Sequence, residues 1–143
     1  MIDRAGLEVL SEEECFRLLT KAPIGRIVFT DRALPAIQPV NFAVHDRAVI
    51  IRVAANSRLA TAASNAVVAF EVDEFDRDGG TRTGWDVVVV GHAAPITDPD
   101  QLREARQLDL RPWAPGIREH YIRIDLRMIS GRRILPAADG GTA

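Results

Sequence analysis

The chain has 143 residues, of which 47% are hydrophobic and 27% charged, with a formal net charge of -2. This length is typical of one domain, and the hydrophobic fraction is sufficient for a core of ordinary size. The nearly balanced charge, spread along the chain without basic blocks, excludes the electrostatic footprint of a protein that binds nucleic acid or anionic membranes. We expect a single domain over residues 1–143, with its core at about 10–135 and a flexible tail at 136–143.

The cysteine content and the N-terminal residues indicate the cellular compartment of the protein. Cys15 is the only cysteine, which excludes an intrachain disulfide and a thiolate metal cluster and favours a reducing environment. The chain begins without an apolar leader, and no apolar run approaches the roughly 20 residues of a membrane span. Lys21 is the only lysine, an arginine bias typical of GC-rich genomes such as those of actinobacteria. The sequence therefore predicts a cytoplasmic protein.

The first predicted element is a helix. Ser11 and Glu14 have the spacing of a capping box, in which the hydroxyl accepts a hydrogen bond from the third backbone N–H. Apolar residues follow at helical spacing until Pro23 stops the helix. Cys15 lies among them with neither a charge nor a motif to activate its thiol, so we interpret it as a packing residue.

From Gly25 onward the pattern changes to the period of two that is typical of strands. Pro39 falls inside the second strand and has no N–H to donate, which places that part of the strand at an edge or a bulge. The six predicted strands cover residues 25–30, 36–44, 48–54, 66–71, 85–94 and 120–128.

Two further short helices are predicted between the strands. One follows an N-cap at Asn56 or Ser57, and the other runs from Asp98 or Asp100 through Gln107. Residues 111–116 form an irregular connection. The order of elements, rich in hairpins, favours an antiparallel barrel over a parallel α/β sheet. The predicted fold class is mainly β with short helices.

No group of residues indicates hydrolytic chemistry or a metal site. His45, His92 and His120 are scattered and form no ligand pattern, so loop or surface roles are favoured for them. The acidic segment at residues 71–76 could supply an acid–base pair or a cation site, but it also fits a strand end that runs into a charged loop. We therefore assign no catalytic side chain and no metal ligand.

Residues 51–59 carry the main indication of a binding site. A strand leads into a loop of small residues, and a helix then begins with backbone N–H groups that can attract a phosphate. Ser57 adds a neutral donor, while Arg58 and Arg52 can add charged ones. An ordinary capped helix with two surface arginines fits the same pattern.

Several segments occur in an informative order. Residues 56–59 read Asn-Ser-Arg-Leu, and the others are residues 25–29, 35–42, 67–73, 83–93 and 129–133. In order and spacing these segments resemble the flavin-binding split barrels of the pyridoxamine 5'-phosphate oxidase-like superfamily, whose phosphate-binding turn typically reads Ser or Thr followed by Lys or Arg. The resemblance covers residues 10–133, nearly the whole chain.

The resemblance implies a six-stranded antiparallel split barrel that forms a homodimer and binds flavin mononucleotide (FMN) between the subunits. By position, Ser57 and Arg58 would hold the phosphate, with Arg52 assisting. Leu59 departs from the lysine that many members have, and Val53 stands where a threonine is common.

The flavin ring has its own expected contacts. The resemblance implies that the backbone at Pro39, Val40 and Asn41 lines the edge of the isoalloxazine, and that Trp85 and Asp86 approach from the partner subunit. A flat, largely apolar ring needs such a crevice with a few fixed polar groups.

The implied activity is that of an FMN-dependent oxidoreductase acting on an unidentified small organic substrate. Residues that hold the substrate phosphate in pyridoxamine 5'-phosphate oxidases are not recognisable here, so vitamin B6 oxidation is not expected. Trp85 and Trp113 fit core or interface roles as well as ring stacking. The alternatives are a deazaflavin-dependent reductase, a non-catalytic flavin- or haem-binding module, and a purely structural dimer.

Overall fold

The computed structural model of the chain describes residues 1–76, 82–110 and 119–136. Its sheet is built around six strands, which are β2 (Ile24–Asp31), β3 (Leu34–His45), β4 (Ala48–Ala54), β5 (Ala66–Phe75), β6 (Gly84–Pro95) and β7 (Glu119–Asp125). Their order is β2-β3-β4-β7-β6-β5, and β5 pairs again with β2, so the six strands close into an antiparallel ring. The predicted six-stranded barrel is confirmed.

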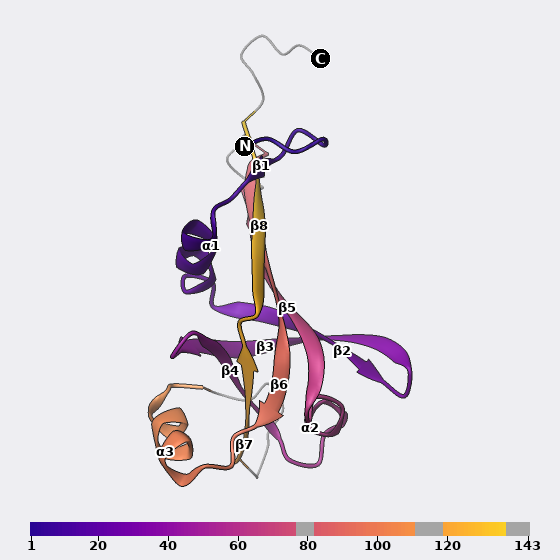
Figure 1. Cartoon of the computed structure of the whole chain (residues 1–143), viewed down its shortest axis with the longest axis vertical. Helices are drawn as coiled ribbons and strands as arrows, with labels where there is room; N and C mark the ends of the chain where they lie inside the picture. Colours follow the sequence, from indigo (N-terminus) through magenta and orange to yellow (C-terminus); the bar gives the residue numbers. More distant parts are fainter. Residues whose placement is uncertain (77–81, 111–118, 137–143) are drawn as a thin grey trace.

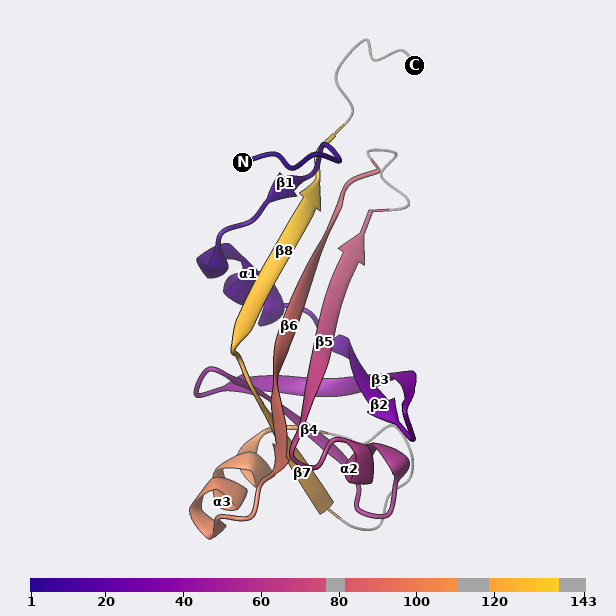
Figure 2. The same cartoon turned by 45° about the vertical axis from the view of Figure 1, so that its right-hand side comes forward.

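β5 and β6 continue beyond this ring (Figure 1). There they are joined by β8 (Met128–Ile134) and by the short β1 (Glu8–Val9). β8 pairs with β6 at residues 84–90, whereas β7 pairs with β6 at residues 93–95. We call β1, β8, residues 84–90 of β6 and residues 72–75 of β5 the arm. Figure 2 shows the strands of the arm rising side by side from the barrel.

The predicted strand over residues 120–128 is wrong in one respect, because the chain divides there into β7 and β8. The backbone N–H of Arg127 donates to the carbonyl of Val90 on β6 at 3.2 Å. A Cβ on Gly91 would lie 1.6 Å from the carbonyl oxygen of Asp125, so two backbones touch where β7 ends. Alternation in a sequence reports the two faces of a strand and not its neighbours, so this change of partner was not visible.

In the described part of the chain, three helices lie outside the sheet. They are α1 (Glu12–Leu19), α2 (Arg58–Ala62) and α3 (Pro99–Gln107). Each begins as predicted with a side chain that caps its first turn, supplied by Ser11, Ser57 and Asp98. α1 packs on β8 of the arm and buries Cys15, which confirms the packing role of that thiol, and α2 packs on β2 and β4. None of these helices has the length and apolar character needed to cross a bilayer.

β3 pairs with β2 along its first eight residues and with β4 only from Phe42 to His45. Pro39 therefore lies where the described part of β3 has one strand neighbour, as predicted for a residue without an N–H. The predicted connection at 111–116, including Trp113, and the tail from residue 137 lie outside the described residues.

The main core fills the barrel and continues along the arm beneath α1. Phe70 of β5 is fully buried, and its ring meets that of Phe42 edge-on with centroids 4.8 Å apart. A second, smaller core lies under α3, where Ile50, Ile96 and Tyr121 meet. The opposite face of the arm is not covered by a described element, and it carries Asp73, Asp86 and Arg132.

Candidate functional site

The predicted phosphate turn lies between β4 and α2, at the end of the molecule away from the arm (Figure 1). The hydroxyl of Ser57 donates to the carbonyl of Ala54 at 2.7 Å and accepts from the N–H of Ala60 at 3.1 Å. The hydroxyl is therefore engaged in closing the turn and capping α2. Because α2 spans only five residues, its dipole is weak, and positive charge at this turn has to come from side chains.

The two arginines predicted to assist Ser57 have different surroundings. The side chain of Arg58 is 74% exposed, and its guanidinium lies 3.7 Å from the carboxylate of Asp31 at the end of β2. Arg52 is half-buried and donates to the carbonyl of Leu110 at 3.1 Å, so it helps to hold the segment that follows α3. Of the predicted phosphate ligands, Arg58 is the one that presents its charge to solvent.

The predicted ring-lining residues alternate across β3. Val40 is buried in the barrel, so it can reach a ligand only through its backbone. Pro39 and Asn41 lie on the outer face, where Pro39 is paired with Arg26 of β2. This stretch of β3 has one strand neighbour, so the other side of its backbone can meet the polar edge of a ligand.

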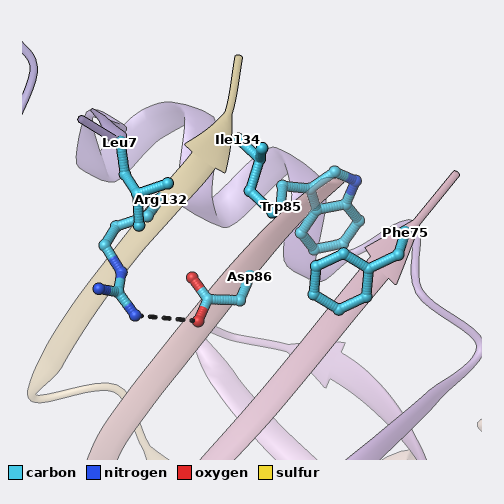
Figure 3. Close-up of a pocket in the computed structure, with 6 residues that line it drawn as sticks. All are labelled: Leu7, Phe75, Trp85, Asp86, Arg132 and Ile134. Carbon is cyan, nitrogen blue, oxygen red and sulfur yellow. Dashed lines mark ion pairs between the residues drawn. The ribbon is translucent and has the colours of Figure 1, made fainter. Parts of the chain in front are cut away.

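Trp85 and Asp86 lie elsewhere, at the tip of the arm. They line a cavity of about 130 Å³ together with side chains from β5, β8 and the N-terminal segment (Figure 3). The guanidinium of Arg132 is 3.7 Å from the carboxylate of Asp86. The remaining walls are apolar and come from Leu7, Phe75 and Ile134. The sequence did not predict β8, which carries Arg132 and Ile134, or β1, which Leu7 directly precedes. These partners of Trp85 and Asp86 were therefore missed.

The arm tip and the phosphate turn are far apart within one protomer. Trp85 pairs with Glu74, near the end of β5, whereas α2 leads into its beginning at Ala66. The intervening strand residues, at about 3.3 Å each, correspond to roughly 25 Å. The structure therefore brings Arg58 and Ser57 together but does not bring Trp85 or Asp86 to them in the same protomer.

Between these two places, the outer face carries a charged group. The guanidinium of Arg26 lies 3.2 Å from the carboxylate of Glu71 and 3.1 Å from that of Asp73. Partial burial and the hydrogen bond with Asp73 raise the pKa of Glu71 to about 7, and the neighbouring Asp86 adds to the effect. Glu71 and Asp73 belong to the acidic segment at residues 71–76 that the sequence singled out. With its pKa raised to about 7, Glu71 changes its charge near neutral pH.

An apolar row crosses five strands on the same outer face. Cross-strand partners share a face, and the row follows four successive pairings through Ile37 of β3, Val28 of β2, Ala69 of β5, Val90 of β6 and Met128 of β8. Both ends of the row, Ile37 and Met128, are largely exposed. We call these five residues the outer apolar row. The row next to it contains Pro39 and Arg26, so apolar surface borders the predicted ring strand.

The three histidines lie on different strands: His92 is in β6, and His120 is in β7, opposite Val53 of β4. His45 ends β3, and its Nε2 lies 3.1 Å from Glu104 of α3 and 3.6 Å from Asp46. The donor atoms of these three residues lie within 4.8 Å of one another, which sequence spacing did not reveal. All three are at least partly exposed, and surface groups of this kind are common without a metal ion.

Comparisons with known proteins agree with this architecture. The family described as pyridoxamine 5'-phosphate oxidase matches residues 11–133. An uncharacterized protein of Mycobacterium tuberculosis, Rv0080, is 39% identical over 131 residues, which cover 88% of this chain and 84% of that protein. The structure of the FAD binding protein from Mycobacterium smegmatis has a TM-score of 0.75 and 37% identity, over 89% of this chain and 97% of that one. A protein of Corynebacterium glutamicum has a TM-score of 0.79 and 33% identity, over 92% and 96% of the two chains. The chain therefore belongs to the pyridoxamine 5'-phosphate oxidase-like family of split barrels.

Proposed function

We propose that the protein is a flavin-dependent oxidoreductase that works as a homodimer on a small organic substrate. The observation that carries this proposal is the Ser57-Arg58 turn. Ser57 uses its hydroxyl to fix the turn, and the adjacent Arg58 presents a guanidinium to solvent from a rigid position at the end of the barrel. A guanidinium held in this way suits the phosphate of a flavin, to which it can donate two parallel hydrogen bonds.

The remaining barrel residues fit a flavin in two ways. Pro39 and Asn41 lie on the outer face beside apolar surface, and among the described strands this stretch of β3 has one neighbour, which suits the polar edge of a ring on its other side. A bound flavin supplies the transfer of hydride or electrons. The protein residues then have to hold the phosphate, orient the ring and exclude water, which needs no nucleophilic side chain.

The proposed residues would contact the part of the molecule that FMN and FAD share. The resemblance points to FMN, and the M. smegmatis relative is named as a protein that binds FAD. FAD contains the same ring and ring-proximal phosphate as FMN, so the residues proposed here suit either form. Absorbance of the purified protein, followed by chromatography of the released chromophore, separates FMN, FAD and a deazaflavin.

The outer apolar row supports the homodimer. A contiguous apolar row on an exposed sheet face marks an interaction surface, and a second copy can cover it through a two-fold interface. Such an interface would also bring the arm of one subunit toward the barrel of the other. Trp85 and Asp86 would then approach a flavin held by the partner, which their own protomer does not permit.

The matched test of the phosphate site compares two exposed arginines. Arg58→Ala should weaken FMN binding by about 1.5–3 kcal/mol, roughly 10- to 150-fold in Kd, the scale of a charge-assisted hydrogen bond. Arg103→Ala is the control, because Arg103 is 69% exposed and also lies beside an aspartate, Asp100, but on α3. Equal Kd values for both variants and the unaltered protein would place the phosphate elsewhere.

The homodimer has its own matched pair. Ile37→Asp puts a charge into the outer apolar row. Leu34→Asp is the control: Leu34 lies on the same strand and is 68% exposed, against 67% for Ile37, but its side chain points to the other face of the sheet. Light scattering during size-exclusion chromatography should report a dimer for the unaltered protein and for Leu34→Asp, and a monomer for Ile37→Asp. A monomeric unaltered protein would contradict the proposal.

A further inference from the structure

The cavity at the arm tip has the form of a small aromatic-binding pocket. Its volume of about 130 Å³ is below the range of drug-sized sites, so it suits a single planar ring system. Trp85 and Phe75 supply aromatic surface, and Leu7 and Ile134 complete the apolar walls (Figure 3). Aromatic side chains in such a position favour a flat, polarisable ring.

Two local features hold these walls in place. The ring of Phe75 lies directly over Gly84, where a Cβ would come within 2.3 Å of it, so no side chain separates the ring from the β6 backbone. Leu7 is fixed by a turn in which the carboxylate of Asp3 accepts from the backbone N–H groups of Ala5 and Leu7, each at 2.9 Å. A pocket that is formed before binding costs little ordering entropy when a ligand enters.

The polar side of the pocket consists of opposite charges that do not form a direct hydrogen bond. At 3.7 Å, the separation between Asp86 and Arg132 exceeds hydrogen-bond length. The carboxylate can accept from a ligand and the guanidinium can donate to it. A ligand edge that carries an N–H donor beside a nitrogen acceptor therefore satisfies both groups, and adenine has such an edge in its N6 amino group and N7.

We propose that the arm pocket binds a purine ring, in particular adenine, stacked on Phe75 with its polar edge between Asp86 and Arg132, which lie on the same face of the sheet. The ring could belong to a free adenine nucleotide or to the adenine half of FAD. The second source rests on the proposed flavin function. It also requires two subunits, because about 25 Å of strand separates the pocket from the phosphate turn of its own protomer.

The first experiment measures adenosine monophosphate binding by isothermal titration calorimetry on the full-length protein. We expect saturable binding that Asp86→Ala weakens about tenfold or more, the effect of losing one charge-assisted hydrogen bond. Asp73→Ala is the matched control, because Asp73 is the direct cross-strand partner of Asp86 and does not line the pocket. Ribose 5-phosphate, which lacks the ring, should not bind.

The second experiment compares FAD with FMN on the same variants and on Ile37→Asp. If the pocket takes the adenine of a bound flavin, FAD binds about tenfold or more tightly than FMN, and Asp86→Ala removes that preference. A monomeric Ile37→Asp protein should bind neither flavin while it still binds adenosine monophosphate. Equal FAD and FMN affinities together with binding of the nucleotide would assign the pocket to free nucleotides.

The two proposals fail in different ways. Binding of adenosine monophosphate without affinity for either flavin would overturn the flavin function and leave the pocket assignment standing. The pocket assignment is overturned if adenosine monophosphate does not bind and no FAD preference depends on Asp86. Flavin binding that is equal for FMN and FAD, without nucleotide binding, would leave the flavin function standing alone.

Discussion

The barrel and the arm use the same strands in different ways. In the barrel, β5 and β6 are part of a closed ring and turn one face toward an interior filled by residues such as Phe70 and Ile122. In the arm, the same strands are covered by α1 on one face, while the other face carries the ion pair of Asp86 and Arg132 and one end of the outer apolar row. The comparison indicates that the barrel supplies most of the stability and carries the phosphate turn, and that the arm adds a second surface for binding.

The charges follow the same division. On the outer face, Glu71, Asp73 and Asp86 lie against two arginines of the described residues, Arg26 and Arg132. On the covered face, Arg133 of β8 reaches both Glu8 and Glu14, at 3.3 and 3.0 Å, and so ties α1 to the arm. The ion pairs of the covered face thus attach α1 and β1 to β8, whereas those of the outer face lie between neighbouring strands of the sheet.

The largest effect should come from a pair of phenylalanines on β5. Phe70→Ala removes a fully buried ring from the barrel and should lower the free energy of unfolding by about 3–5 kcal/mol. Phe75→Ala removes a ring of the arm that is 53% exposed and should cost less than about 1 kcal/mol. Urea denaturation of both variants measures the difference, and equal losses would contradict the division of roles between barrel and arm.

A smaller loss is expected at the junction of the two parts. In Gly91→Ala the new Cβ would meet the backbone carbonyl of Asp125 at 1.6 Å, so β6 and the end of β7 must move apart. We expect a loss of about 1–3 kcal/mol, the usual cost of forcing atoms into a packed contact. Thermal and urea unfolding should both report it. An unchanged stability would show that the strand change at this point tolerates displacement.

The outer face should respond to pH through Glu71. Its pKa is raised to about 7 in the folded protein, from 4.5, so the folded state prefers the protonated carboxyl. The stability that this preference contributes is present below pH 4.5 and is lost as the pH rises through 7. Glu71→Gln should therefore remove a decline in stability between pH 4.5 and 7. A variant that keeps the full decline would assign it to another group.

The covered face should respond in the opposite direction. Hydrogen bonds from Arg17 and then Arg133 lower the pKa of Glu14 to about 2, so this carboxylate contributes stability above pH 4.5 that is lost as the pH falls toward 2. Glu14→Gln should flatten the acid limb of the stability curve and leave the neutral limb unchanged. Denaturation midpoints between pH 2 and 5 test this, and an unaltered acid limb would contradict it.

Most of the barrel could be predicted from the sequence because its strands have regular alternation and its helices have clear caps. The arm could not be predicted in the same way. β8 continues the chain after β7 with only Leu126 and Arg127 between them, and the change from one neighbour to another leaves no mark in local patterning. β1 has two residues, too few for any period to show.

The candidate site was predicted in parts. Local signals identified Ser57 and Arg58, because a cap and a cation lie side by side in the sequence. They also gave Arg52, which donates a hydrogen bond to the carbonyl of Leu110 and whose role at the phosphate stays a prediction. The pocket around Trp85 depends on contacts between residues as distant in the chain as Leu7 and Ile134, and such convergence requires the three-dimensional fold.

The central claim is that a flavin binds where two copies of this chain meet. Size-exclusion chromatography with light scattering and visible absorbance, after incubation with FMN or FAD, tests it most directly. We predict that flavin absorbance elutes with a species of twice the 15.7 kDa chain mass, and that Ile37→Asp elutes as a monomer without flavin. Flavin that stays with the monomer, or a dimer that retains neither flavin, would contradict the account.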